Sequence, residues 1–300
     1  MQRLIIVYNP RSSKFGQVEK DVLNKARELK GWTVGKYEIK PIGVDKNAVA
    51  LAKILQDGDT VVSAGGDGTS TVTFNAIMAF GGKVKYGVLG YGNFNDLAKT
   101  FKAKKLEQIL ETKPVEVWPL EAMVDGKHWR YAIGYITMGL FAEATEIFDD
   151  KKTRKKLQGG KKTPVFSWKV LAKWYFKNKN KRAFMPEFKL NGVKMPKKTT
   201  DYVAINGRSM AGVMKGRAWY LDKKVFQSET AKLGSFCRLF SLMAKSILYK
   251  VPGKEVKGDT LEFLEPGEVE IQAEGEYVKL KNVKKIEIRK AEKCLNIVKI

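Results

Sequence analysis

Strand-like runs alternate with helical patterns over the first 113 residues. Leu4 to Tyr8 is continuously apolar, as expected of a strand buried in a parallel sheet. Further strands are predicted over residues 34–39, 60–64 and 85–89, and helices over 17–30, 47–55 and 72–78. This alternation predicts an α/β fold whose N-terminal part is a Rossmann-like parallel sheet with helices on both faces.

The pattern changes after residue 113. Residues 115–124 and 128–137 flank Asp125 and Gly126, which favour the tight turn of a β-hairpin. Later strand-like runs cover residues 188–190, 202–206, 261–264, 269–273, 277–280, 285–289 and 295–298. They predict a second, β-rich and sandwich-like domain of mostly antiparallel strands. We expect the first domain over residues 1–113, the second over 114–284, and C-terminal strands at 285–300 that return to the first domain.

Three polar loops fall at the carboxyl ends of predicted strands, at residues 9–14, 65–70 and 90–96. Ligands of such sheets bind at that edge. The glycines of the second loop let the backbone approach a ligand, and the helix N-terminus that follows favours a phosphate. Asp67 would repel a phosphate unless a cation lies between them, so the loop indicates a nucleotide phosphate held with Mg²⁺. A plain glycine turn with Asp67 as a helix cap explains the same residues.

Composition adds one unusual property, because 56 Lys and Arg against 32 Asp and Glu give a net charge of +24. Such a balance favours an anionic membrane surface or nucleic acid as a partner. The two cysteines, Cys237 and Cys294, lie far apart, which argues against a disulfide framework or a zinc site and favours a reducing cytoplasm. No apolar run is long enough for a transmembrane helix, and the first run is too short for a signal peptide. One histidine, His128, excludes Ser-His-Asp chemistry.

The segment from Lys151 to Arg182 has thirteen Lys and Arg and no acid. Phe166, Val170 and Trp174 recur within it at helical spacing. A helix with aromatic residues on one side and lysines around it can lie in a membrane interface, where each cation contributes roughly 1 kcal/mol against anionic lipid. The same features suit nucleic acid, and they equally suit a helix that packs its aromatic residues inward. We therefore expect a cytoplasmic protein that associates peripherally with membranes.

Four blocks of the sequence resemble the diacylglycerol kinase catalytic family, soluble bacterial lipid kinases related to sphingosine kinases. The blocks are Tyr8-Asn9-Pro10-Arg11-Ser12-Ser13, Gly65-Gly66-Asp67-Gly68-Thr69, Gly92-Asn93-Phe94-Asn95-Asp96-Leu97-Ala98-Lys99-Thr100, and Gly275-Glu276. The resemblance spans essentially the whole chain and is clearer in its first domain. It implies a two-domain kinase that uses ATP and Mg²⁺ to phosphorylate the hydroxyl of diacylglycerol or a related lipid alcohol.

The resemblance also implies roles for individual residues. Asp67 and Asp96 would belong to the carboxylate and Mg²⁺ network, Glu276 would accept the hydroxyl proton, and Glu274 would stand beside it in the catalytic turn. If the chain is extended there, the carboxylates of Glu274 and Glu276 point to one side. The nucleotide would be lined by Asn9, Pro10, Arg11, Ser12, Ser13, Gly65, Gly66, Asp67, Gly68, Thr69, Asn93 and Asn95.

Three departures from the family pattern concern the site. Ser13 replaces a glycine of the first loop, and Glu274 replaces an aspartate. In the turn at residues 221–224 a lysine falls on the position of an aspartate that binds a structural Mg²⁺, with Asp222 beside it as the remaining metal ligand.

Two alternatives remain open from the sequence alone. An NAD kinase shares Gly-Gly-Asp-Gly-Thr, but its next loop has Gly-x-Asn-x-Gly followed by Asn-Glu, which this chain lacks. A non-catalytic protein with a degenerate kinase fold, binding acidic lipid or nucleic acid, would account for the charge and for the lysine in the metal turn.

Overall fold

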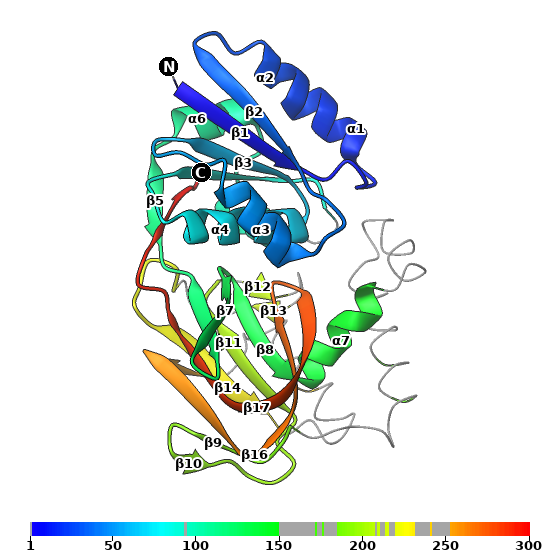
Figure 1. Cartoon of the computed structure of the whole chain (residues 1–300), viewed down its shortest axis with the longest axis vertical. Coiled ribbons are helices and arrows are strands. Elements are labelled where there is room, and N and C mark those ends of the chain that lie inside the picture. The colour runs from blue at the N-terminus through cyan, green and yellow to red at the C-terminus, as the bar shows by residue number, and fades with distance from the viewer. Residues whose placement is uncertain are drawn as a thin grey trace. The chain divides into compact units, whose positions relative to one another are not determined.

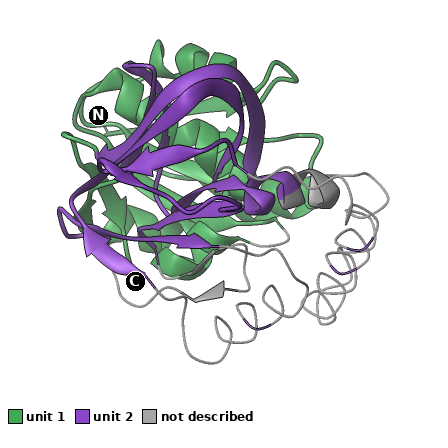
Figure 2. Cartoon of the chain, turned by 90° about the horizontal axis from the view of Figure 1, so that it is seen from below, with its two compact units in different colours: residues 1–119, 291–300 green, residues 120–290 purple. Residues whose placement is uncertain are grey.

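The computed structural model describes residues 2–92, 95–149, 185–207, 209–210, 214–215, 220–231 and 253–300, and the single residues 172, 176 and 241. The chain divides into two compact units, coloured separately in Figure 2. Unit 1 comprises Met1–Pro119 and Ala291–Ile300, and unit 2 comprises Leu120–Lys290. Asn93 and nearly all of the basic segment that begins at Lys151 lie outside the described residues.

Unit 1 is built on a six-stranded sheet with the order β2-β1-β3-β4-β18-β5 (Figure 1). All neighbouring strands are parallel except β5, which pairs antiparallel with β18. The strands are β1 (Gln2–Tyr8), β2 (Trp32–Glu38), β3 (Thr60–Gly65), β4 (Lys85–Gly90), β5 (Pro114–Val117) and β18 (Leu295–Val298). The central strands β1 and β3 are almost wholly buried, which explains their continuous apolar sequences.

Helices cover both faces of this sheet. They are α1 (Phe15–Val18), η1 (Glu19–Asn24), α2 (Lys25–Arg27), α3 (Val44–Ala52), α4 (Asp67–Phe80), α5 (Asp96–Phe101) and α6 (Leu106–Glu111). The first three are consecutive and form one helical run with a wider π turn in its middle. Val18 and Val22 of this run pack with Leu4 and Ile6 in one buried cluster. On the other face Ser70 of α4 contacts Ser63 of β3 through their hydroxyl oxygens, 3.2 Å apart. The predicted Rossmann-like arrangement is therefore confirmed.

Unit 2 contains one large antiparallel sheet with the order β15-β14-β11-β8-β16-β17-β6-β7, and β9 and β10 branch from β16. Its strands are β6 (Leu120–Val124), β7 (Lys127–Ala132), β8 (Tyr135–Gly139), β9 (Phe188–Leu190), β10 (Val193–Lys194), β11 (Asp201–Ile205), β14 (Phe226–Ala231), β15 (Lys254–Val256), β16 (Gly258–Ala273) and β17 (Glu276–Lys290). The helix α7 (Leu140–Asp149) follows β8, and β12 (Ser209–Met210) and β13 (Met214–Lys215) form a separate small ribbon.

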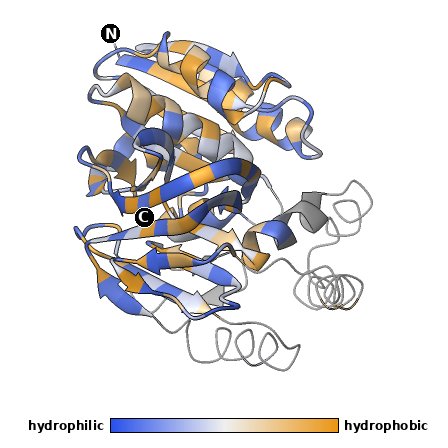
Figure 3. Cartoon of the chain, turned by 60° about the horizontal axis from the view of Figure 1, so that its bottom comes forward, coloured by the Kyte–Doolittle hydropathy of each residue, from blue (hydrophilic) through white to orange (hydrophobic). Residues whose placement is uncertain are grey.

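The long strands β16 and β17 form the backbone of unit 2. Their register shifts between Glu262 and Val269, and the alternation of hydrophilic and hydrophobic residues along them can be followed in Figure 3. Buried residues from β6 and from β14, near the two ends of the strand order, join the same hydrophobic cluster. The sheet therefore curls and encloses a core. The β-rich second domain predicted from the sequence is confirmed.

The boundaries of the units lie a few residues after the expected ones. Residues 114–117 form the edge strand β5 of unit 1, and β17 continues to Lys290 before the chain returns to unit 1. The predicted hairpin at Asp125 and Gly126 joins β6 to β7, and both residues have the positive φ that a type I′ turn requires. Among the described helices, none is long and apolar enough to cross a membrane.

Candidate active site

Three loops of unit 1 follow the carboxyl ends of β1, β3 and β4. In the strand order β1 lies between β2 and β3. The connection after β1 leads to β2 on one side of it, and the connection after β2 crosses back to β3 on the other side. Such a reversal is the point where parallel α/β sheets bind ligands, outside the carboxyl ends of the two strands. The loops after Tyr8 and Gly65 lie at this point, as the spacing of the sequence predicts.

The glycine turn between β3 and α4 is closely packed against the loop after β4. The Tyr91 N–H donates to the Gly65 carbonyl oxygen over 2.8 Å. A Cβ atom at Gly92 would lie 2.5 Å from the Cα of Gly66, and one at Gly65 would lie 2.3 Å from the hydroxyl of Thr69. Because these contacts leave no room for side chains, the glycines are needed here for close approach of two backbones.

The N-terminus of α4 has no side-chain cap. Its cap residue is Gly66, which has no side chain to accept from the first turn, and the helix runs for 14 residues. The N–H groups of a helix's first turn carry a partial positive charge and suit the oxygens of a phosphate.

Asp67 binds a different helix from its own. Its Oδ1 accepts the N–H of Asp96 over 2.8 Å, and its Oδ2 accepts the N–H of Asn95 over 3.0 Å. Both donors lie at the start of α5, so the carboxylate caps that helix and fixes the third loop to the second. The interpretation of Asp67 as a cap of the helix that follows its own turn is therefore wrong, because α4 has no side-chain cap and Asp67 caps α5 instead.

The ionised form of Asp67 is disfavoured in this position. The pKa of the Asp67 carboxyl is raised to about 6, because burial and then the nearby Asp96 carboxylate raise it by more than the two backbone hydrogen bonds and the Lys99 ammonium lower it. Two carboxylates held close enough to oppose each other's ionisation would be stabilised by a cation. Asp67 and buried Asp96 therefore fit the Mg²⁺ network that the sequence predicts.

The third loop is closed by Asn95. Its Oδ1 accepts the Gly92 N–H over 2.6 Å and its Nδ2 donates to the Gly92 carbonyl oxygen over 2.8 Å. Asn95 itself adopts the left-handed conformation, with φ of 52°, which asparagine tolerates better than most residues. The Asn95 side chain is thus engaged within its own loop, and its part in nucleotide binding stays a prediction.

The first loop is a series of tight turns after β1. Asn9 accepts the N–H of Arg11 at its side-chain oxygen over 3.0 Å and the N–H of Ser12 at its carbonyl oxygen over 3.1 Å. The Ser12 hydroxyl oxygen is buried and has no hydrogen-bond partner among the described residues. Ser13 has no positive φ, which explains why the loop tolerates serine where the family has glycine. Lys14 reaches across to the Gly92 carbonyl oxygen at 3.4 Å.

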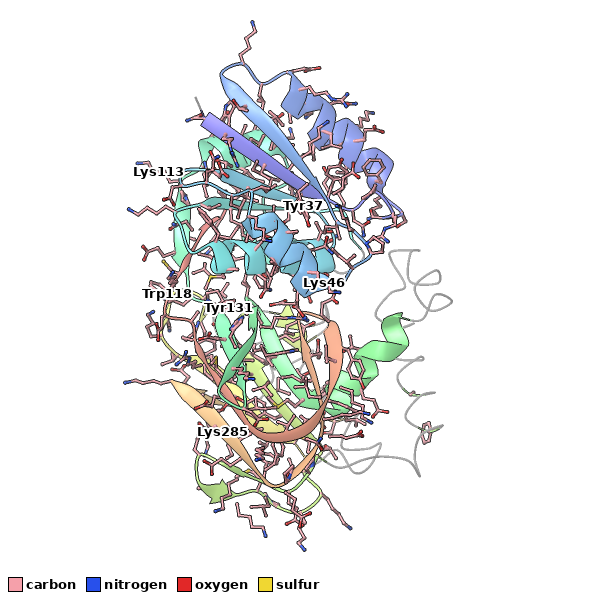
Figure 4. All side chains as sticks on the ribbon, in the orientation of Figure 1. Tyr37, Lys46, Lys113, Trp118, Tyr131 and Lys285 are labelled. Atoms are coloured by element: carbon pink, nitrogen blue, oxygen red, sulfur yellow. The ribbon has the colours of Figure 1, made fainter. Side chains whose placement is uncertain are left out.

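Beside the first loop, the end of β2 is tied to α3. The Tyr37 hydroxyl, whose residue is labelled in Figure 4, donates to the Asn47 carbonyl oxygen over 3.1 Å. The Asn47 side chain accepts the Lys40 N–H over 2.9 Å and donates to the Lys40 carbonyl oxygen over 2.8 Å. These contacts make the edge of the sheet beside the first loop rigid.

In unit 2, Glu274 and Gly275 form the two-residue turn between β16 and β17. Both have positive φ, 53° and 85°, as in a type I′ hairpin turn. The chain is therefore not extended at Glu274, and the condition under which Glu274 and Glu276 would point to one side is not met. Glu276 is the first residue of β17 and is partly exposed, whereas Glu274 is only 5% exposed.

Buried contacts hold this turn from beneath. The Glu274 carboxylate accepts the N–H of Gly134 in a short hydrogen bond. Gln272 accepts the Gly275 N–H over 2.7 Å and donates to the hydroxyl of Thr137 over 2.9 Å. Glu274 thus has a structural contact that the sequence did not indicate. Gln272 also supports the turn. Alternation along a strand does not predict this, because Gln272 is buried although its neighbours Ile271 and Ala273 are buried too.

The turn at residues 221–224 does not bring carboxylates together. Asp222 is exposed, and within the residues the structure describes there is no group of three His, Cys, Asp or Glu side chains suited to a metal ion. The cation nearby is Lys290, which is 8% exposed and donates to the side-chain oxygen of Asn206 and to the carbonyl oxygen of Tyr220. The pKa of the Lys290 ammonium is lowered to about 7, because burial and then the Lys224 charge lower it by more than the Asp222 carboxylate raises it.

Comparison with known proteins shows which family this chain resembles. Residues 3–134 match the model of the diacylglycerol kinase catalytic domain. The chain is 32% identical over 100 residues to a diacylglycerol kinase of Staphylococcus saprophyticus, covering 33% of this chain and 32% of that protein. It is 34% identical over 100 residues to a diacylglycerol kinase of Staphylococcus epidermidis, covering 33% of this chain and 31% of that protein. The aligned stretch thus spans about a third of the length of these curated relatives.

A solved structure of a diacylglycerol kinase from Bacillus anthracis str. Sterne has the same fold as the whole chain. The TM-score is 0.67 at 15% sequence identity, and the match covers 100% of this chain and 97% of that one. The resemblance to the diacylglycerol kinase catalytic family, predicted from four short blocks, is confirmed.

Proposed function

We propose that the chain is an ATP-dependent lipid kinase that transfers the γ-phosphoryl group of ATP to the hydroxyl of diacylglycerol or a related lipid alcohol. The observation that carries the proposal is the Asp67 arrangement within the matched segment 3–134. The Asp67 carboxylate joins the loop after β3 to the loop after β4 through two hydrogen bonds. It lies beside the N-terminus of α4, which has no side-chain cap. A nucleotide phosphate and a divalent cation together would satisfy both features.

Residues of unit 1 would bind and orient the nucleotide. The N–H groups at the start of α4 and the Ser12 hydroxyl would donate to phosphate oxygens. Asp67 and Asp96 would hold Mg²⁺, which when bound supplies positive charge that neutralises the phosphates. Gly66 and Gly92 would keep the two loops close enough for the backbone to contact the phosphates directly. Phosphoryl transfer depends mainly on this positioning and charge neutralisation.

Glu276 would accept the proton of the lipid hydroxyl. It stands at the start of β17, directly after a rigid type I′ turn, and it is accessible where Glu274 is not. A positioned general base typically contributes roughly 10²- to 10⁴-fold to a rate. Glu274 would fix the turn through Gly134 rather than take part in proton transfer.

The test is a transfer assay with radiolabelled ATP, Mg²⁺ and anionic liposomes that contain diacylglycerol or other lipid alcohols, with NAD as a separate acceptor. Labelled lipid is expected, and label in NAD alone would favour the NAD kinase alternative. Glu276→Gln should lose at least 10²-fold in rate. Glu268→Gln is the matched control, because Glu268 is exposed on β16 and its ion pair with Lys279, at 2.7 Å, lies at the surface. No labelled lipid with any acceptor would refute the proposal.

A titration of ATP with and without Mg²⁺ separates a kinase from a non-catalytic protein of the same fold. Binding that strengthens with Mg²⁺ supports the kinase. Metal-independent, weak binding would support the degenerate alternative.

We also propose that the segment from Lys151 to Arg182 binds an anionic membrane surface, where the lipid substrate is located. Its thirteen cations and absence of acids support this. The test is co-sedimentation with anionic and neutral liposomes, in competition with duplex DNA. Preference for anionic liposomes supports the proposal, and tighter, salt-sensitive binding to DNA would refute it.

A further inference from the structure

Unit 2 contains a buried cation at the end of its longest hairpin. Lys290 is the last residue of β17 and is 8% exposed. Its ammonium donates to the Asn206 side-chain oxygen in a short hydrogen bond and to the Tyr220 carbonyl oxygen over 2.8 Å. Burial and the Lys224 charge disfavour the charged form of Lys290, and the Asp222 carboxylate favours it. A buried ammonium is strongly destabilising unless oxygen acceptors surround it, as they do here.

The acceptors around Lys290 are oxygens of the kind that a hard divalent cation takes as ligands. The Asn206 side chain is oriented by its other end, since Nδ2 donates to the Ile133 carbonyl oxygen over 2.9 Å. Its Oδ1 is therefore directed at the ammonium. A metal ion and the ammonium would compete for the same amide and carbonyl oxygens.

We propose that the Lys290 ammonium takes the place of the structural Mg²⁺ expected in unit 2. The turn that should supply metal carboxylates has Lys223 and Lys224 after Asp222, and all three side chains are exposed. With a fixed cation inside and lysines outside, the position has no need of a metal and repels one. The Lys290 ammonium therefore compensates for the lysine that replaces a metal-binding aspartate in the turn at residues 221–224.

The ammonium also positions the turn that carries Glu276, an inference that rests on the proposed function. Asn206 and Gly207 both donate their N–H groups to the Gly134 carbonyl oxygen, over 2.7 and 2.9 Å. Gly134 in turn donates its N–H to the Glu274 carboxylate, in the turn immediately before Glu276. Hydrogen bonds through Asn206 and Gly134 thus connect Lys290 to Glu274, two residues before the proposed general base, which makes Lys290 a positioning residue.

The first test uses the wild-type protein without nucleotide. Amide hydrogen exchange of residues 202–207 and 220–224 is compared in EDTA and in millimolar Mg²⁺. The same protection in both supports the proposal, because the cation is part of the chain. Protection that appears only with Mg²⁺ would show a metal site and overturn it.

The second test compares Lys290→Met with Lys285→Met, a control on the same strand whose ammonium pairs with Glu287 at 3.0 Å near the surface. Lys290→Met should speed exchange of the amides at 272–276 at least tenfold and lower kcat while the KM for ATP stays unchanged. Lys285→Met should change neither. Wild-type exchange at the turn in Lys290→Met would overturn the positioning role. If Lys290→Met does not fold, the wild-type comparison still decides the proposal. If the wild type phosphorylates no lipid, the proposed function fails while both exchange measurements still test Lys290.

Discussion

The pH dependence of stability in unit 1 should follow the ionisation of Asp67. The folded-state pKa of about 6 lies above the ordinary value of 3.8, so the folded state binds more protons than the unfolded state between these two values. Stability is then highest below pH 4 and falls as pH rises to about 6. A shift of 2.2 units, from 3.8 to 6, corresponds to about 3 kcal/mol. Asp67→Asn removes the ionisation and so removes this decline.

The assay is urea unfolding of the wild type and Asp67→Asn across pH 4 to 7, with the difference between the two proteins plotted against pH. The difference cancels the many surface carboxylates that both proteins share. The wild type should lose about 2 kcal/mol of stability relative to the variant between pH 4 and 7. Saturating Mg²⁺ and ATP should reduce the loss, because a cation beside Asp67 favours its charged form. A difference that does not change with pH would refute the interpretation of Asp67 as a carboxylate strained by burial and by Asp96.

Three further predictions concern other contacts. Asp201 is fully buried, and burial raises its pKa to about 7, so its ionisation should lower stability by about 3 kcal/mol as pH rises from 4 to 7; Asp201→Asn should abolish that slope in the same assay. Gly92→Ala should weaken ATP binding, measured by calorimetry, since its Cβ would lie 2.5 Å from the Gly66 backbone; Gly16→Ala, which meets nothing within 4 Å, should not. Glu274→Ala should cost roughly 1 to 3 kcal/mol in thermal unfolding by leaving a buried N–H unpaired, and an unchanged Tm would contradict this.

The sequence was most informative where local pattern and tertiary environment agree. The run from Leu4 to Tyr8 is apolar because both faces of a central parallel strand are covered, so its position followed directly from the pattern. The common position of the three polar loops could be predicted from these strands, because the carboxyl ends of parallel strands lie at one edge of the sheet. The partners of Asp67 did not follow, because they belong to a helix that only the folded sheet brings near.

Two features of unit 2 were missed for different reasons. Glu274 was considered as part of an extended segment, although Glu-Gly between two strand-like runs is compatible with a two-residue turn. Lys290 could have been found, because Ile286 and Ile288 place it by alternation on the buried face of β17. The oxygens that receive its ammonium come from the loops at Asn206 and Tyr220, and no pattern in the sequence connects these to β17.

The position of β18 has a consequence for how the chain is made. Residues 295–298 pair with both β4 and β5, yet the ribosome synthesises them only after all of unit 2. Until then β4 presents an unpaired edge, and β5 lacks its neighbour in the sheet. Open strand edges recruit other chains, so a nascent chain stalled before Leu295 should be prone to aggregation although the residues of its three polar loops are already complete. The strand that joins β4 to β5 in this sheet is therefore synthesised only after all of unit 2.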